Sequence, residues 1–120
     1  MAHILIIDDE QPIRLMLRKM LESEGYIVTE ASNGAEGIKR YHENPADLII
    51  TDLIMPEKEG TETIIELKKE NPAVKIIAMS GGGKNKPDGY LHTAKLLGAT
   101  QTFEKPVRKN ELLDAIRKLI

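Results

Sequence analysis

Two hydrophobic patterns alternate along this chain, a short apolar run typical of a strand and a longer apolar stripe typical of a helix. The first run, residues 3–7, is rich in isoleucine and is followed by acidic residues. Over residues 11–24 the apolar positions recur every three to four residues, which places them on one face of a helix. Pro12 suits the first turn of this helix, and Gly25 suits its end.

The same alternation continues to the end of the sequence. Further strands are predicted over residues 26–31, 47–52, 74–79 and 100–104. Further helices are predicted over about 33–43, 58–70, 89–97 and from about 112 onward. The first, third and fourth strands are nearly continuous apolar runs, so we expect them at the centre of a sheet that is covered on both faces.

Five strand–helix pairs predict an α/β fold with a doubly wound, five-stranded parallel sheet. Five strands are too few for a closed eight-stranded barrel, and the flavodoxin-like (βα)5 order 2-1-3-4-5 is the natural alternative. Other strand orders stay open at this point. With 120 residues and no linker or low-complexity segment, the chain is predicted to form a single domain over residues 1–120.

Composition removes several classes of function. The absence of cysteine excludes disulfide scaffolds, thiol catalysis and cysteine-based zinc sites. A net charge of -2, 3% aromatic residues and no tryptophan provide neither a basic surface nor a stacking platform, so no direct nucleic-acid partner is expected. No apolar run approaches the ~18 residues of a membrane span, and no signal peptide precedes the first strand. We therefore expect no membrane partner and a cytoplasmic location.

Polar side chains collect where the predicted strands end. Asp8 and Asp9 follow the first strand, Asp52 ends the third, Ser80 follows the fourth and Lys105 follows the fifth. Ligands of open parallel sheets bind beyond the carboxyl ends of the strands, so we expect these side chains to meet. Any one of them alone is more often a turn or helix cap. Their origin on four different strands favours a functional cluster.

Three carboxylates on adjacent strands repel one another, and a hard divalent cation removes the conflict. We expect Asp9 and Asp52 to bind Mg²⁺ directly and Asp8 to act through water. A carboxylate can also be a phosphorus nucleophile, and Asp52 is the best candidate because it lies between the other donors. Lys105 and Ser80 could each serve one phosphoryl oxygen while the metal serves a third.

The order and spacing of four motifs resemble the receiver domain of bacterial two-component response regulators. The motifs are Ile6-Ile7-Asp8-Asp9-Glu10, Asp52-Leu53-Ile54-Met55-Pro56 with Gly60 four residues on, Met79-Ser80-Gly81, and Lys105-Pro106. The resemblance implies that Asp52 accepts a phosphoryl group and that the backbone carbonyl of Ile54 joins Asp9 and Asp52 around Mg²⁺. It also implies that Asp8 touches the metal through water, that Ser80 is a switch hydroxyl, and that Lys105 pairs with phosphoryl oxygen.

The resemblance further implies a signalling domain, not an enzyme, although one that assists its own phosphorylation and dephosphorylation. A sensor histidine kinase or a phosphotransfer protein would donate the phosphoryl group. A conformational change around the loop after Ser80 and the face of the fifth strand would relay the signal to an output protein that the sequence does not identify. Homodimerisation on activation is a further expectation from the family.

Three local features qualify these expectations. Thr102 stands where the family often has an aromatic switch residue, and strand alternation directs the neighbouring Phe103 to the opposite face. Ile54 and Gly82, at positions that tune hydrolysis in the family, cannot orient a water molecule with their side chains, so a long-lived phospho-Asp52 is predicted. The three histidines, without metal-ligand spacing, are expected at the surface: His3, His42 and His92.

Three other classes of protein share part of this pattern. A Mg²⁺-dependent phosphatase with an aspartate nucleophile normally carries Asp-x-Asp on its first strand, whereas this chain has adjacent Asp8 and Asp9. A flavodoxin-like cofactor binder is disfavoured because its phosphate loop would here be acidic. An interaction module that is never phosphorylated is disfavoured because the residues for phosphorylation are all present: Asp9, Asp52, Ser80 and Lys105.

Overall fold

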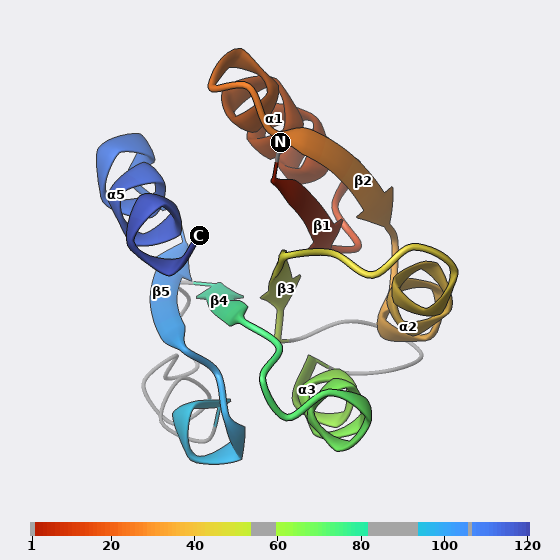
Figure 1. The fold of residues 1–120 in the computed structure, drawn as a ribbon. Coiled ribbons are helices and arrows are strands. Elements are labelled where there is room, and N and C mark those ends of the chain that lie inside the picture. The colour runs from red at the N-terminus through yellow and green to blue at the C-terminus, as the bar shows by residue number, and fades with distance from the viewer. Residues whose placement is uncertain (1, 54–59, 82–93, 106) are drawn as a thin grey trace.

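The computed structural model describes residues 2–53, 60–81, 94–105 and 107–120. The described strands are β1 (His3–Ile7), β2 (Ile27–Ala31), β3 (Leu48–Asp52), β4 (Ile76–Gly81) and β5 (Gln101–Lys105). They pair in parallel as one sheet in the order β2-β1-β3-β4-β5. The predicted fold class and strand order are confirmed, with the three most apolar strands in the middle (Figure 1).

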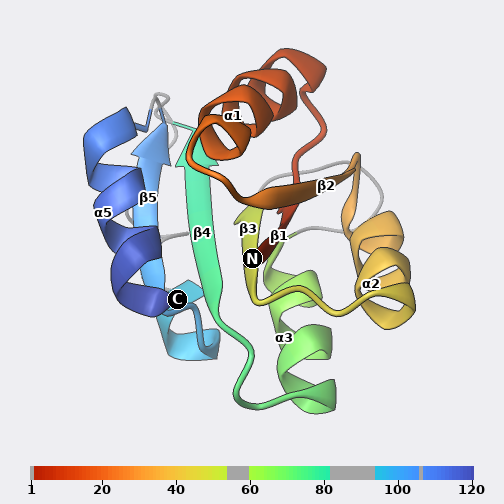
Figure 2. The same ribbon diagram turned by 45° about the horizontal axis from the view of Figure 1, so that its top comes forward.

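Helices cover both faces of the sheet. α1 (Gln11–Ser23) and α5 (Lys109–Leu119) lie on one face, and α2 (Gly34–Glu43) and α3 (Gly60–Glu70) lie on the other (Figure 2). Residues 94–97 are also helical, and Ala94 packs with the second pair. No described helix has the length and apolar character needed to cross a membrane.

β1 shows why the strand runs are apolar at every position. Ile4 and Ile6 pack under α1 and α5, whereas Leu5 and Ile7 pack under α2 and α3. All four side chains are essentially inaccessible to solvent. Successive side chains of a strand point to opposite faces, so a strand covered on both faces buries each of them. Each such burial contributes about 1.5–3 kcal/mol.

Element boundaries differ from the predicted ones by a few residues. β4 begins at Ile76 instead of 74, because the N–H of Val74 is bonded to the carbonyl of Asn71 in the turn after α3. The strand also continues through Gly81, so Ser80 lies inside β4 and not after it. α5 begins at Lys109, before its first apolar residue. The part of the predicted fourth helix before residue 94 and the loop predicted after Ser80 lie outside the described residues.

The predicted surface location of the histidines is wrong for His3. This side chain is 9% exposed, and its Nε2 lies 2.9 Å from the hydroxyl of Thr29 on β2. His3 opens a strand whose two neighbours and covering helices leave little surface, which the sequence pattern did not reveal. His42 is exposed on α2, as predicted, where it pairs with Glu70. His92 lies outside the described residues.

Candidate functional site

The carboxyl ends of three strands bring two carboxylates and one ammonium group together. The Nζ atom of Lys105 lies 2.8 Å from Oδ2 of Asp8 and 3.4 Å from Oδ2 of Asp52. The same ammonium group is 3.5 Å from Oε1 of Glu10. Lys105 and Asp8 are 97 residues apart in the chain, and the parallel sheet brings them to one edge.

Asp8 is completely buried, and all of its polar groups are bonded. Its N–H donates to the carbonyl of Ala31 at 3.1 Å, which extends the pairing of β1 with β2. Its Oδ1 accepts a hydrogen bond from the N–H of Glu10 at 2.9 Å, and its Oδ2 accepts one from Lys105. A buried carboxylate needs such partners because burial without them is costly. Asp8 is therefore held in one orientation.

Asp52 is 4% exposed at the end of β3. Burial raises the pKa of its carboxyl to about 6; the positive charge of Lys105 opposes the shift, and the negative charges of Asp8 and Asp9 add to it. The N–H of Leu53 donates to Oδ1 of Asp52 at 2.9 Å. The repulsion expected from the sequence is thus present, and Lys105 compensates only part of it.

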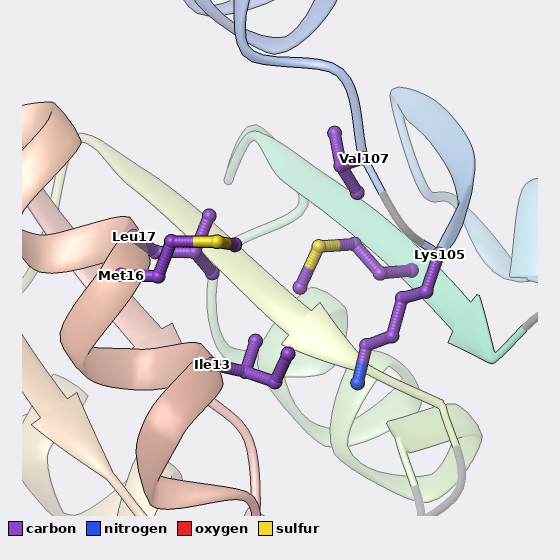
Figure 3. Close-up of a pocket in the computed structure, with 6 residues that line it drawn as sticks. Ile13, Met16, Leu17, Lys105 and Val107 are labelled. Atoms are coloured by element: carbon purple, nitrogen blue, oxygen red, sulfur yellow. The ribbon is translucent and has the colours of Figure 1, made fainter.

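Burial lowers the pKa of the Lys105 ammonium, but its hydrogen bond to Asp8 and the charges of Asp52 and Asp8 outweigh this effect. The net result is a raised pKa, so the group stays charged. The aliphatic part of the side chain lines an apolar cavity of about 110 Å³ between α1 and the segment after β5 (Figure 3). The other lining residues are Ile13, Met16, Leu17, Met79 and Val107.

The donor set fits a hard divalent cation. Asp8, Asp9 and Glu10, which we call the acidic turn, each offer a carboxylate oxygen, and these oxygens lie within 4.8 Å of one another. Carboxylate oxygens are the ligands that Mg²⁺ prefers. Glu10 was not among the predicted ligands. Its position directly after Asp8 and Asp9 in the sequence could have indicated that its carboxylate lies beside theirs. Ile54, whose carbonyl was the other predicted ligand, lies outside the described residues, as do Gly82 and Pro106.

Ser80 is completely buried, and its Oγ has no hydrogen-bond partner within the described parts of the chain. Its strand lies between β3 and β5, where Met79 is paired with Asp52 and Gly81 with Lys105. Buried hydroxyl groups are nearly always bonded, so an unbonded one at this edge is a donor available to a ligand. Its place in the sheet is consistent with the predicted switch hydroxyl.

Thr102, at the predicted switch position, and its neighbour Phe103 face opposite sides of β5. Phe103 packs against the core under α1 and α5, as the alternation predicted. Thr102 is half-buried and is paired in register with Ala78, whose side chain belongs to the other core. The ring of Phe103 therefore does not replace the aromatic switch residue that the family often has at the position of Thr102.

The fold and this site define a class of protein. The family model of the response regulator receiver domain matches residues 4–117. The chain belongs to this family, whose general function is phosphorylation on an aspartate within two-component signalling systems.

Particular relatives span different lengths. The chain is 34% identical to the chemotaxis protein CheY of Bacillus subtilis over 122 residues, covering 100% of this chain and 99% of that protein. It is 36% identical over 115 residues to the transcriptional regulatory protein GlrR of Escherichia coli, covering 96% of this chain but 25% of that protein.

Solved receiver structures agree with the fold. A receiver domain protein from Clostridium thermocellum superposes with a TM-score of 0.91 at 34% identity, covering 100% of this chain and 94% of that one. The response regulator TrrA of Thermotoga maritima, solved in complex with Mg(2+)-BeF, superposes with a TM-score of 0.86 at 32% identity, covering 100% of both chains.

Proposed function

We propose that this receiver domain accepts a phosphoryl group on Asp52 in the presence of Mg²⁺, from a sensor histidine kinase or a phosphotransfer protein. The observation that carries the proposal is the buried Asp52 carboxylate at the end of β3, with the Lys105 ammonium 3.4 Å away. Asp52 has one positive neighbour, Lys105, and two negative neighbours, Asp8 and Asp9. A bound metal ion would offset the excess negative charge and allow a phosphoryl group to be held at Asp52.

The residue roles follow from the site. A carboxylate oxygen of Asp52 attacks phosphorus in line, and the bond from phosphorus to the donor's histidine nitrogen breaks, leaving the electron pair on nitrogen. Lys105 neutralises charge on one phosphoryl oxygen, and the Oγ of Ser80 donates a hydrogen bond to another. Preorganised donors of this kind stabilise the charge that develops in the transition state.

A bound Mg²⁺ would supply charge neutralisation on the phosphoryl oxygens. Asp9 and Asp52 would hold it directly, together with the carbonyl of Ile54, and Asp8 would act through water. Glu10 adds a further carboxylate beside these residues. TrrA, a relative that matches this chain over its whole length, was solved in complex with Mg(2+)-BeF, which supports Mg²⁺ binding by this chain.

Phosphorylation would relay a signal through Lys105 and Ser80. A phosphoryl group on Asp52 would draw Lys105 away from Asp8 and bring Ser80 into a new hydrogen bond. Both residues lie on strands at one end of the sheet, so the change reaches the loop after β4 and the outer face of β5. An output protein or a second copy of the domain would recognise that altered face. Because its own side chains would hold the phosphoryl group and the metal, the domain would assist its own phosphorylation and dephosphorylation. It would not turn over a separate substrate.

The test is intact mass after incubation with Mg²⁺ and a small-molecule phosphodonor. We expect the wild type to gain one phosphoryl group and Asp52→Ala to gain none. Asp114→Asn, which changes an exposed aspartate on α5, should be labelled like the wild type. Equal labelling of Asp52→Ala would overturn the assignment, and steady hydrolysis of a phosphate ester would indicate the phosphatase alternative instead.

A further inference from the structure

Arg14 connects three elements behind the acidic turn. It lies near the start of α1, and its side chain is only 15% exposed. Its Nη1 donates a hydrogen bond of 2.6 Å to the backbone carbonyl of Asp8, and its Nε donates one of 3.1 Å to Oε1 of Glu30 on β2. One guanidinium group therefore links α1, the end of β1 and β2.

This contact is the hydrogen bond that holds the backbone carbonyl of Asp8 in the acidic turn. β1 ends at Ile7, and α1 begins at Gln11 with Glu10 at its N-cap position, which makes no side-chain capping bond. The N–H of Asp8 is held by Ala31, and the carbonyl of Asp8 is held by Arg14. Removal of Arg14 would leave the backbone carbonyl of Asp8 without this hydrogen-bond donor.

A cation beside an acidic site would normally weaken the binding of a divalent ion. Glu30 reduces this effect because its carboxylate accepts hydrogen bonds from both Arg14 and Arg18, the latter at 2.8 Å. The hydrogen bond from Arg18 is the main cause of the lowered pKa of Glu30, and burial opposes it, so the carboxylate stays ionised at neutral pH. The guanidinium of Arg14 can thus hold the turn while Glu30 offsets part of its charge.

We propose that Arg14, anchored by Glu30, is a positioning residue for divalent-cation binding: it fixes the backbone of Asp8 so that the carboxylates of the acidic turn converge. It touches neither the cation nor the phosphoryl group. The inference rests on the Mg²⁺ site proposed above and adds to it a group on α1 and its anchor on β2, the edge strand of the sheet.

The sign of a mutational effect separates positioning from charge alone. If Arg14 acted only as a nearby positive charge, its replacement by glutamine would tighten Mg²⁺ binding by Coulomb's law. If it holds the Asp8 carbonyl, the same replacement weakens binding, by about tenfold, as is usual for groups that orient metal ligands. Arg14→Lys keeps the charge but loses the fork that reaches two acceptors at once, so it should also weaken binding.

Arg18→Gln is the matched control. Arg18 lies one turn further along α1 and also bonds Glu30, but its other described hydrogen bond is to Glu22 and not to the acidic turn. Isothermal titration calorimetry with MgCl₂ would measure the dissociation constant of each purified variant. Thermal unfolding without metal would measure the stability of each.

We expect Arg14→Gln to bind Mg²⁺ about tenfold more weakly and Arg14→Lys several-fold more weakly, with Arg18→Gln within about twofold of the wild type. Unchanged or tighter binding by a folded Arg14→Gln would overturn the inference, and so would an equal loss in Arg18→Gln. If Arg14→Gln does not fold, wild-type affinity in Arg14→Lys overturns it. If the wild type itself binds no Mg²⁺, the proposed metal site fails and this inference fails with it. Wild-type binding with no effect of Arg14 removes the inference alone.

Discussion

At the scale of single residues, the site holds more negative charge than its one ammonium group compensates. Asp8 and Asp52 are both buried, and Lys105 contacts both of them. Burial makes the ionised form of Asp52 less favourable, and the charge of Lys105, which also bonds Asp8, offsets this only in part. A cation bound at this edge would recover part of the free energy lost in this way.

The raised pKa of Asp52 predicts a pH dependence of stability. Its pKa is about 6 in the folded protein, against 3.8 for an unperturbed aspartate, so the folded state binds the proton more tightly. The Asp52 carboxyl should therefore add stability to the metal-free protein as the pH falls from about 7 to about 4, by up to about 2 kcal/mol after allowance for solvent screening. Glu30 and Glu36, whose pKa values are lowered in the folded protein, act in the opposite direction at the acidic end of this range.

The control for this prediction is Asp52→Asn, which cannot titrate. Urea unfolding of both proteins in metal-free buffer at several pH values would measure the difference in their free energies of unfolding. The wild type should become less stable relative to Asp52→Asn as the pH rises through 6. A constant difference across this range would contradict the prediction.

Sequence patterns located the side chains of the candidate site but not the contacts that orient them. Asp8, Asp52 and Lys105 could be found because each follows or ends a predicted strand, and parallel strands present their carboxyl ends at one edge. Arg14 and the burial of His3 could not be found in this way. Both depend on which strand lies beside β1, and no periodicity within one element contains that information.

At the scale of elements, the start of α3 lies in close backbone contact with the end of β3. A Cβ atom on Gly60 would lie 2.2 Å from the backbone oxygen of Asp52 and 2.6 Å from the Cα of Leu53. The N–H of Gly60 donates to the carbonyl of Leu53 at 2.9 Å. Because the crowded atoms belong to the backbone that carries Asp52, they cannot move aside without moving the site.

Gly60→Ala should therefore destabilise the fold by about 3 kcal/mol and reduce phosphorylation of the variant that remains folded. Gly25→Ala is the matched control, since a Cβ there meets no atom within 4 Å, and only its φ of +91° is unfavourable. That change should cost about 1 kcal/mol and leave phosphorylation intact. Urea unfolding and the mass assay measure the two effects, and equal behaviour of the two variants would refute the argument.

Periodicity predicted the type and order of the described elements more closely than their ends. The central position of β1, β3 and β4 could be inferred because these strands are apolar on both faces, whereas the sequence left other strand orders open. The start of β4 depends on the turn at Asn71, and the start of α5 depends on backbone bonding at Arg108, where Leu112 donates to its carbonyl. These local hydrogen bonds leave no hydrophobic signal.

At the scale of the whole molecule, the site exists only when the sheet is complete. Its side chains come from β3, β4 and β5 and from the acidic turn between β1 and α1. An unfolded chain cannot hold these carboxylates together, so Mg²⁺ should bind the folded state preferentially.

Mg²⁺ should therefore raise the free energy of unfolding, by about 2.7 kcal/mol at a concentration one hundred times its dissociation constant. Asp9→Asn removes an exposed carboxylate of the acidic turn and should abolish most of this gain with little effect on the metal-free fold. Thermal unfolding with and without MgCl₂ measures both. A wild type and an Asp9→Asn variant stabilised to the same extent would place the cation elsewhere.

Because Lys105 lies 97 residues after Asp8 in the chain, it is also synthesised much later than Asp8. β5 leaves the exit tunnel after the other four strands, so a nascent chain has its acids in place before the one lysine that compensates them. Until that strand docks beside β4, the emerging polypeptide lacks the ammonium contact of a finished receiver. Translation that stops before β5 would therefore release a product without Lys105, one of the groups proposed to hold the phosphoryl group.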